Sequence, residues 1–244
     1  MPDSAKVTAL EFSKLSELAA EQFIKIIQET LKKQSRFTCA LAGGKSPEPL
    51  YQALAKFKNE KFWDKVYLFT TDERFVPAGH DYNNFSMLQR NLLAELPIPK
   101  GNCYPMPVDL ASPELAAKMY EAEIQRFFNL KTGQFPQFDA VLLGLGEDGH
   151  TASLFPVVPQ WKEKQKLVIS LAHKSVEYGR LSLTLPVLNN ARHVIFFVHG
   201  EKKADVMKKV LAAKSLLPAA QVKPLKGKLY FWLDQAAAKK IRIQ

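Results

Sequence analysis

The stretch that decides the fold is residues 138–156, Phe-Asp-Ala-Val-Leu-Leu-Gly-Leu-Gly-Glu-Asp-Gly-His-Thr-Ala-Ser-Leu-Phe-Pro. It begins with the apolar run Ala140–Leu143, which is typical of a buried strand. Three glycines then fall within six residues and permit tight turns and the close approach of a ligand. Glu147, Asp148 and His150 stand among them, and two carboxylates beside an imidazole suit acid–base chemistry. The pattern predicts a strand that ends in a reactive loop.

The rest of the chain repeats this succession of apolar run, polar loop and amphipathic segment. Residues 14–33 predict one long helix, and Ser112-Pro113 marks the start of another. The first is expected to bury Leu15, Leu18, Ala19, Phe23, Ile26, Ile27 and Leu31, and the second Ala116, Met119, Tyr120, Ile124, Phe127 and Phe128. Strands are predicted at 37–42, 66–71, 140–143, 167–172, 180–185, 194–198 and 228–233, with a weaker extended segment at 102–106 and shorter helices at 49–57, 84–93, 201–211 and 234–239.

This alternation predicts a single domain over residues 1–244 with an α/β fold. We expect a mainly parallel, Rossmann-like sheet with helices on both faces. One pair of strands departs from the parallel rule, because residues 167–172 and 180–185 are joined by a short connection and a parallel pair needs a longer crossover. These two segments therefore predict a short antiparallel hairpin.

The chain carries a formal net charge of +10, which predicts attraction to nucleic acid, acidic membranes or phosphorylated metabolites. The basic residues are dispersed, without the ladder of basic and aromatic residues that binds single strands. No apolar run approaches the ~20 residues of a membrane helix, and residues 1–13 lack the pattern of a secretory leader. Cys39 and Cys103 fit neither a disulfide framework nor a metal site, so we expect a cytoplasmic protein.

Four polar turns each follow a predicted strand directly, at residues 43–46, 72–77, 144–150 and 199–203. In an open α/β sheet the ligand binds outside the carboxyl ends of the strands, so parallel strands would bring all four turns to one edge. Each turn alone could be a simple connection, and a lone His150 could merely bond a backbone carbonyl. The expected convergence of the turns is what predicts a site.

Several of these residues suit an anionic ligand. Residues 43–46 join a strand to a helix that begins near Pro47, and backbone N–H groups at such a junction bind phosphate. Lys203 opens a helix, where the dipole disfavours a cation unless an anion lies nearby; simple exposure to water is the alternative. The antiparallel hairpin would carry Arg180 to the same edge.

Two glycine motifs match known patterns only in part. Gly144-x-Gly146-x-x-Gly149 follows a strand, but Pro156 cuts short the helix that a dinucleotide fold needs. Gly44-Lys45-Ser46 is similar to the end of a Walker A loop, but Cys39 stands where the first glycine of that loop belongs. We therefore expect neither a dinucleotide fold nor a P-loop.

With these residues assembled, the chain resembles the 6-phosphogluconolactonases of the sugar-phosphate isomerase/deaminase-like superfamily over nearly its whole length. The resemblance rests first on Gly-Glu-Asp-Gly-His-Thr-Ala-Ser-Leu-Phe-Pro at residues 146–156, which is very specific for these lactonases. It also rests on Leu-Ala-Gly-Gly-Lys-Ser-Pro at 41–47, Asp-Glu-Arg-Phe-Val-Pro at 72–77 with Asn84, residues 180–189, Gly200-x-x-Lys203, Pro218-Ala219 and Trp232-x-x-Asp234.

The resemblance implies hydrolysis of 6-phospho-D-glucono-1,5-lactone in the pentose phosphate pathway, with no metal and no cofactor. It implies that His150 is the general base and that Asp148 and Asp72 are further catalytic residues. The implied binding residues are Gly43, Gly44, Lys45, Ser46, Arg180 and Lys203 at the phosphate and Arg74 at the sugar. The expected partner is a small sugar phosphate, with no nucleic acid or membrane, and the expected state is a monomer or weak homodimer. Lys45 and Asn83 depart from the usual pattern, which has small hydroxyl residues at both places.

Three alternatives remain. Amino-sugar-phosphate deaminases of the same superfamily share Asp-Gly-His but carry a glutamate five residues after the histidine, where this chain has Phe155. A basic nucleic-acid-binding protein would account for the charge but not for the four turns. A regulator that only binds a sugar phosphate would not need both Asp148 and His150. Of the other histidines, only His199 follows a strand and is a further candidate for the site.

Overall fold

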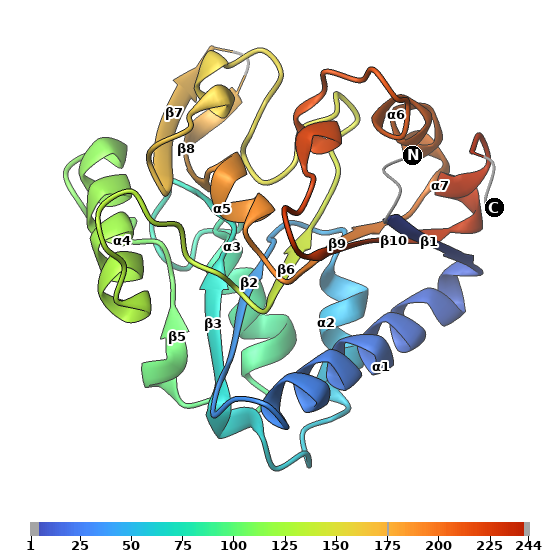
Figure 1. Ribbon diagram of the computed structural model, residues 1–244, viewed down its shortest axis with the longest axis horizontal. Helices are drawn as coiled ribbons and strands as arrows, with labels where there is room; N and C mark the ends of the chain where they lie inside the picture. The colour runs from blue at the N-terminus through green and yellow to red at the C-terminus, as the bar shows by residue number, and fades with distance from the viewer. Residues whose placement is uncertain (1–4, 175, 242–244) are drawn as a thin grey trace.

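Two β-sheets organise the computed structural model, which describes residues 5–174 and 176–241 (Figure 1). The larger has seven strands in the order β1-β10-β9-β6-β2-β3-β5, and every neighbouring pair is parallel. Its strands are β1 (Ala5–Leu10), β2 (Phe37–Leu41), β3 (Val66–Thr70), β5 (Cys103–Tyr104), β6 (Ala140–Leu143), β9 (His193–Val198) and β10 (Lys228–Asp234). The predicted parallel sheet is confirmed.

The smaller sheet has the order β4-β8-β7 and is antiparallel. Strands β7 (Val168–His173) and β8 (Val176–Leu183) form the predicted hairpin; residue 175, in its connection, lies outside the described residues. Strand β4 (Asp72–Arg74) corrects the sequence analysis, which treated these residues as loop. They become a strand because they pair with β8, a partner more than 100 residues away that no local pattern reveals.

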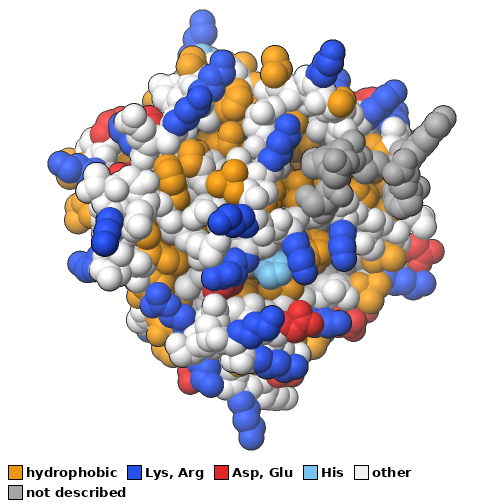
Figure 2. Space-filling view, viewed as in Figure 1, with side chains coloured by type: hydrophobic (Ala, Val, Ile, Leu, Met, Phe, Trp, Pro, Cys, Tyr) orange, Lys and Arg blue, Asp and Glu red, His pale blue; other side chains and the backbone are white. Residues whose placement is uncertain are grey.

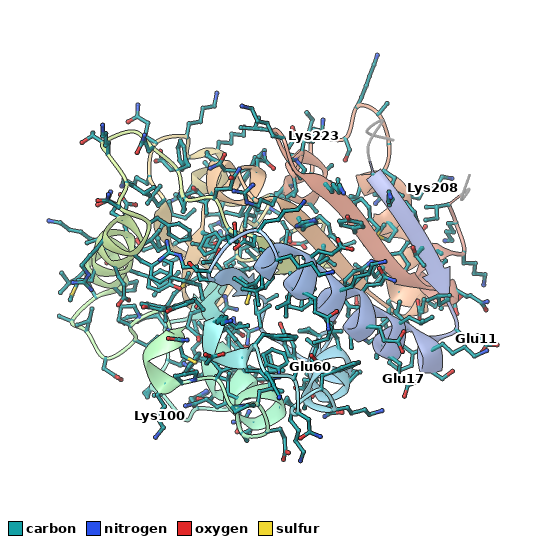
Figure 3. All side chains as sticks on the ribbon, turned by 60° about the horizontal axis from the view of Figure 1, so that its bottom comes forward. Glu11, Glu17, Glu60, Lys100, Lys208 and Lys223 are labelled. Carbon is teal, nitrogen blue, oxygen red and sulfur yellow. The ribbon has the colours of Figure 1, made fainter. Side chains whose placement is uncertain are left out.

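Helices cover both faces of the larger sheet, as predicted. The helices are α1 (Phe12–Leu31), α2 (Glu48–Ala55), α3 (Asn84–Leu88), α4 (Pro113–Phe128), α5 (Leu185–Asn189), α6 (Ala204–Val210) and α7 (Gln235–Ala238). Figure 3 shows α1 lying across one face, with Glu11 and Glu17 directed away from the sheet. No helix among the described residues is long and apolar enough to span a bilayer.

The central strands of the larger sheet contribute side chains to two cores, because successive side chains point to opposite faces. In β9, Ile195 and Phe197 join the core under α1, α2 and α3. Val194, Phe196 and Val198 join the core under α4, α6 and the smaller sheet. Burial on both faces explains why this strand reads as one continuous apolar run.

Three details of the sequence analysis were wrong or incomplete. Strand β1 was not predicted; it pairs only with β10 at the edge of the sheet. Leu18 and Met119 were placed on buried helix faces, yet they are 39% and 51% exposed. On α4 the predicted Ala116, Tyr120 and Ile124 are buried, whereas Phe127 and Phe128 are only partly buried, because the face that packs on the core is narrower than the apolar stripe.

Candidate active site

A cavity of about 520 Å³ opens where strands β2, β3, β6 and β9 end. Its walls come from all four predicted turns: residues 42–46, Asp72 with Arg74, residues 144–148 with His150, and Lys203. Asn84 and Ala152 complete the wall. The predicted convergence of the turns at one edge is confirmed.

His150 and Asp148 are two lining side chains in direct polar contact. The Nδ1 atom of His150 lies 2.5 Å from Oδ1 of Asp148, which also accepts the backbone N–H of His150 at 3.1 Å. Partial burial acts to raise the pKa of Asp148, but the hydrogen bonds and charge of His150 outweigh it and lower that pKa below its ordinary value. An ionised carboxylate at Nδ1 keeps the ring proton on that nitrogen, which leaves Nε2 free to accept a proton.

Gly146 makes room for the imidazole. A Cβ atom added at this position would lie 2.1 Å from Nδ1 of His150 and 2.6 Å from Oδ1 of Asp148. The turn is closed by a hydrogen bond from Gly146 N–H to the His150 carbonyl at 2.8 Å. The imidazole also packs against Phe155, with the two ring centroids 4.4 Å apart. The ring is therefore held by a glycine and an apolar side chain.

The turn at residues 43–46 presents backbone donors to the cavity. Among the described residues, none accepts a hydrogen bond from the N–H groups of these four positions. Gly44 has φ = +85°, a conformation that glycine adopts at no steric cost. His199 Nε2 donates to the carbonyl of Ser46 at 2.9 Å, so this histidine supports the turn without lining the cavity. Lys45 is exposed at the cavity wall.

Besides Lys45, three cations lie at or beside the cavity. Lys203 and Arg74 are in its wall, and partial burial lowers the pKa of Lys203 while Glu147 and Asp148 oppose that shift. Arg180 is not in the wall; it is the cross-strand neighbour of Arg74 in the smaller sheet. Burial lowers the pKa of Arg180, Arg74 lowers it further, and its Nη1 atom is buried without a hydrogen-bond partner. Two cations directly opposite each other repel, and the carboxylates of Asp72, Glu177 and Glu73 oppose this effect on the pKa of Arg180.

The carboxylate of Asp72 is held by two hydrogen bonds from hydroxyl groups, which the sequence does not reveal. Asp72 is 7% exposed; its Oδ2 accepts the hydroxyl of Ser153 at 2.7 Å, and its Oδ1 accepts that of Thr71 at 3.1 Å. The carboxylate thus lines the cavity in a fixed orientation, bound to the turn that carries His150.

Sequence reasoning gave no role to Ser153 or Glu73 and cited Asn84 only as part of a motif. Ser153 lies three residues after His150, but its hydroxyl donates to Asp72, which is 81 residues earlier in the chain. Only the folded chain reveals this contact. Among the described residues, no cluster of three histidine, cysteine or carboxylate side chains could hold a metal ion.

Known proteins are similar to this chain in both sequence and fold. The model of the family described as glucosamine-6-phosphate isomerases/6-phosphogluconolactonase matches residues 11–231, so the chain belongs to this family. The 6-phosphogluconolactonases of Synechocystis sp. and Nostoc sp. are 39% and 37% identical to it, over 88% and 89% of this chain and 89% and 90% of theirs. The crystal structure of 6-phosphogluconolactonase from Thermotoga maritima has a TM-score of 0.82 at 29% identity and covers 94% of this chain and 99% of its own. Within the family, these relatives place the chain with the 6-phosphogluconolactonases.

Proposed function

We propose that the protein hydrolyses 6-phospho-D-glucono-1,5-lactone to 6-phospho-D-gluconate as a step of the pentose phosphate pathway. The observation that carries the proposal is the pairing of His150 with Asp148 at one end of a cavity whose other walls present Lys203, Arg74 and free backbone N–H groups. A phosphorylated lactone matches both parts of the cavity. Its phosphate suits the cations and the N–H groups, and its activated ester suits His150 and Asp148. The names of the relatives support the same substrate.

His150 is the general base of this reaction. Its Nε2 takes a proton from a water molecule whose oxygen bonds to the lactone carbonyl carbon. The bond between that carbon and the ring oxygen then breaks, and the imidazolium returns its proton to the ring oxygen, which becomes a hydroxyl group. Asp148 stabilises the imidazolium that forms in between. Because a lactone is an activated ester, water and a base suffice, and general base action contributes about 10²–10⁴-fold.

The phosphate lies between the turn at residues 43–46 and the cations. Backbone N–H groups at the start of α2 donate to it, and Lys203, Arg74 and Arg180 supply positive charge. Holding the phosphate fixes the ring, so the carbonyl is presented to His150 in one orientation. Asp72, bonded to Ser153, aligns the sugar end of the cavity.

Lys203→Ala should raise KM about 10- to 100-fold with little loss of kcat, because a charged hydrogen bond to the phosphate is lost. Lys202→Ala is the matched control, since Lys202 is the neighbouring lysine, is exposed and does not line the cavity. Steady-state kinetics on both variants measure the difference. Equal KM values for the two variants would remove Lys203 from the phosphate site.

Arg180→Ala should weaken binding of 6-phosphogluconate about tenfold, because the bound phosphate loses one of its cationic partners. Titration calorimetry on the folded variant measures this affinity. An affinity equal to that of the wild type would show that the buried guanidinium serves only the smaller sheet.

The alternative within the family is an amino-sugar-phosphate deaminase. Against it stands Phe155, whose ring packs on His150 at the position where those enzymes carry a glutamate. A phenyl ring cannot transfer the proton that opens an amino-sugar ring. Lactone loss, corrected for spontaneous hydrolysis, and ammonia release from glucosamine 6-phosphate should be measured on the same preparation. Ammonia release without accelerated lactone loss would favour the deaminase.

A nucleic-acid-binding protein is disfavoured by the distribution of charge. On the face of the molecule that Figure 2 shows, lysine and arginine side chains are spread among apolar, polar and acidic ones and form no continuous basic stripe. The proposal further includes a single domain over residues 1–244, a monomer or weak homodimer, and a cytoplasmic location. The location is supported by two free thiols, Cys39 and Cys103.

A further inference from the structure

Glu73 is a buried carboxylate next to the site that the proposed reaction does not use. It is 0% exposed, and its two oxygens accept three backbone N–H groups. Oε1 accepts those of Arg74 at 2.8 Å and Asn84 at 2.6 Å, and Oε2 accepts that of Phe85 at 2.9 Å. Two of these groups belong to the first turn of α3, so the carboxylate ties β4 to the start of that helix.

Asn84 connects Glu73 to the cavity, because it binds Glu73 through its backbone and lines the cavity wall. Its Nδ2 donates to the carbonyl of Asp72 at 2.9 Å. Its side chain fills the space above Gly43 so closely that a Cβ on Gly43 would lie 1.9 Å from Cγ of Asn84. Asn84 is 2% exposed and packs between the phosphate turn and the segment that carries Asp72.

We propose that Glu73 is a positioning residue: it fixes Asn84, and Asn84 sets the spacing between the turn at residues 43–46 and Asp72. Glu73 does not line the cavity, so it acts on the substrate through the wall residues it holds: chiefly Asn84 at the start of α3, and the backbone of Arg74 on its own strand. The inference rests on the proposed function for its kinetic consequence, whereas the anchoring of Asn84 can be measured without any substrate.

The charge of Glu73 decides how many of these N–H groups it can accept. Burial raises the pKa of Glu73 to about 7; the three N–H groups oppose this shift, and the Asp72 carboxylate adds to it. The other charged or titratable groups that act on it are Arg180 from β8 and Tyr120 from α4. Above about pH 7 the ionised carboxylate accepts all three N–H groups. Below that pH the protonated acid must donate its own hydrogen, and the attachment of Asn84 weakens.

Glu73→Gln keeps the size of the side chain but turns one acceptor oxygen into a donor. At pH 8 this variant should raise KM for the lactone about tenfold while kcat changes less than about threefold, because the phosphate turn is misplaced but His150 is not. The ratio of the KM values of variant and wild type should shrink as the pH falls from 8 to 6, because the wild type then loses its own carboxylate. Taking the ratio cancels the titration of the substrate phosphate. A ratio that stays constant with pH, or an effect on kcat alone, would overturn the proposal.

Amide hydrogen exchange supplies the readout that does not depend on activity. In wild-type protein the N–H groups of Asn84 and Phe85 should exchange faster at pH 6 than at pH 8 after correction for intrinsic rates, and in Glu73→Gln this difference should vanish. Unchanged protection of both amides in the variant would overturn the inference. If the wild type protects these amides as expected but hydrolyses no lactone, the proposed function fails while the anchoring role stands.

Two further variants separate positioning from general damage to α3. Asn84→Ala keeps Glu73 and should reproduce the rise in KM. Asn83→Ala is the control: it removes the N-cap bond from Ser86 N–H to Asn83 Oδ1 at 2.8 Å but leaves the contacts of Asn84 with Gly43 and Asp72 in place. An equal rise in KM in Asn83→Ala, or no rise in Asn84→Ala, would contradict a route through Asn84.

Discussion

Replacing His150 with alanine should lower kcat for lactone hydrolysis about 10²–10⁴-fold and leave the fold intact. The imidazole is the one group in the cavity wall with a nitrogen free to accept a proton from water once Asp148 has engaged Nδ1. Its side chain is 32% exposed, so its loss leaves no large buried void. Lactone consumption, corrected for the spontaneous rate, and thermal unfolding measure the two halves of this prediction.

His193→Ala is the comparison for this experiment. His193 begins β9, whereas the cavity opens where β9 ends, so this histidine lies at the opposite edge of the sheet. The variant should retain wild-type turnover. Turnover in His150→Ala that equals that of His193→Ala would exclude His150 as the base. A loss of activity that follows unfolding in both variants would mean that stability, and not chemistry, had been measured.

Gly146→Ala should lower kcat about 10²-fold while KM changes little. The new methyl group would occupy the place of the imidazole, because its carbon would lie 2.1 Å from Nδ1 and 2.2 Å from Cε1 of His150. Asp148 is displaced as well, since Oδ1 would be 2.6 Å away. The base therefore turns away from the carbonyl, whereas the phosphate turn at residues 43–46 keeps its own geometry. Kinetics resolved into kcat and KM test this directly.

Gly144 offers a matched control in the same loop. A Cβ at this position would meet no protein atom within 4 Å, so Gly144→Ala should keep kcat within about twofold of wild type. Gly144 lines the cavity, so any change in this variant should fall on KM. A crystal structure of Gly146→Ala should show the imidazole rotated out of its position. Similar losses in both variants would indicate that the loop tolerates no substitution, and the specific role of Gly146 would be disproved.

Much of the fold was predictable because the buried strands carry their own signal. The run Ala140–Leu143 is apolar on both faces, and the structure places it in the centre of the parallel sheet. Edge elements were harder to predict. Strand β1 gains its stability from pairing with β10, and β4 from pairing with β8. Neither partner is near in sequence, so a local pattern could not show these strands.

The location of the site was predictable for a topological reason, since turns after parallel strands must meet at one edge. The finer contacts were not predictable. Nothing in the order of residues places Ser153 on Asp72, or Asn84 against Gly43, because each pair joins turns from different strands. Arg180 was expected at the same edge as the turns; it lies opposite Arg74 in the smaller sheet, beside the cavity wall. The direction of the Arg180 side chain on β8 is set by packing and pairing with β4 and β7, which the sequence does not display.

The most direct test of this account is a crystal structure of the protein with 6-phosphogluconate bound. The account predicts the phosphate on the N–H groups of residues 43–46 and on Lys203, with the C1 carboxylate within hydrogen-bond distance of Nε2 of His150. A sugar phosphate bound with its phosphate at His150, or outside the cavity at the ends of β2, β3, β6 and β9, would contradict it.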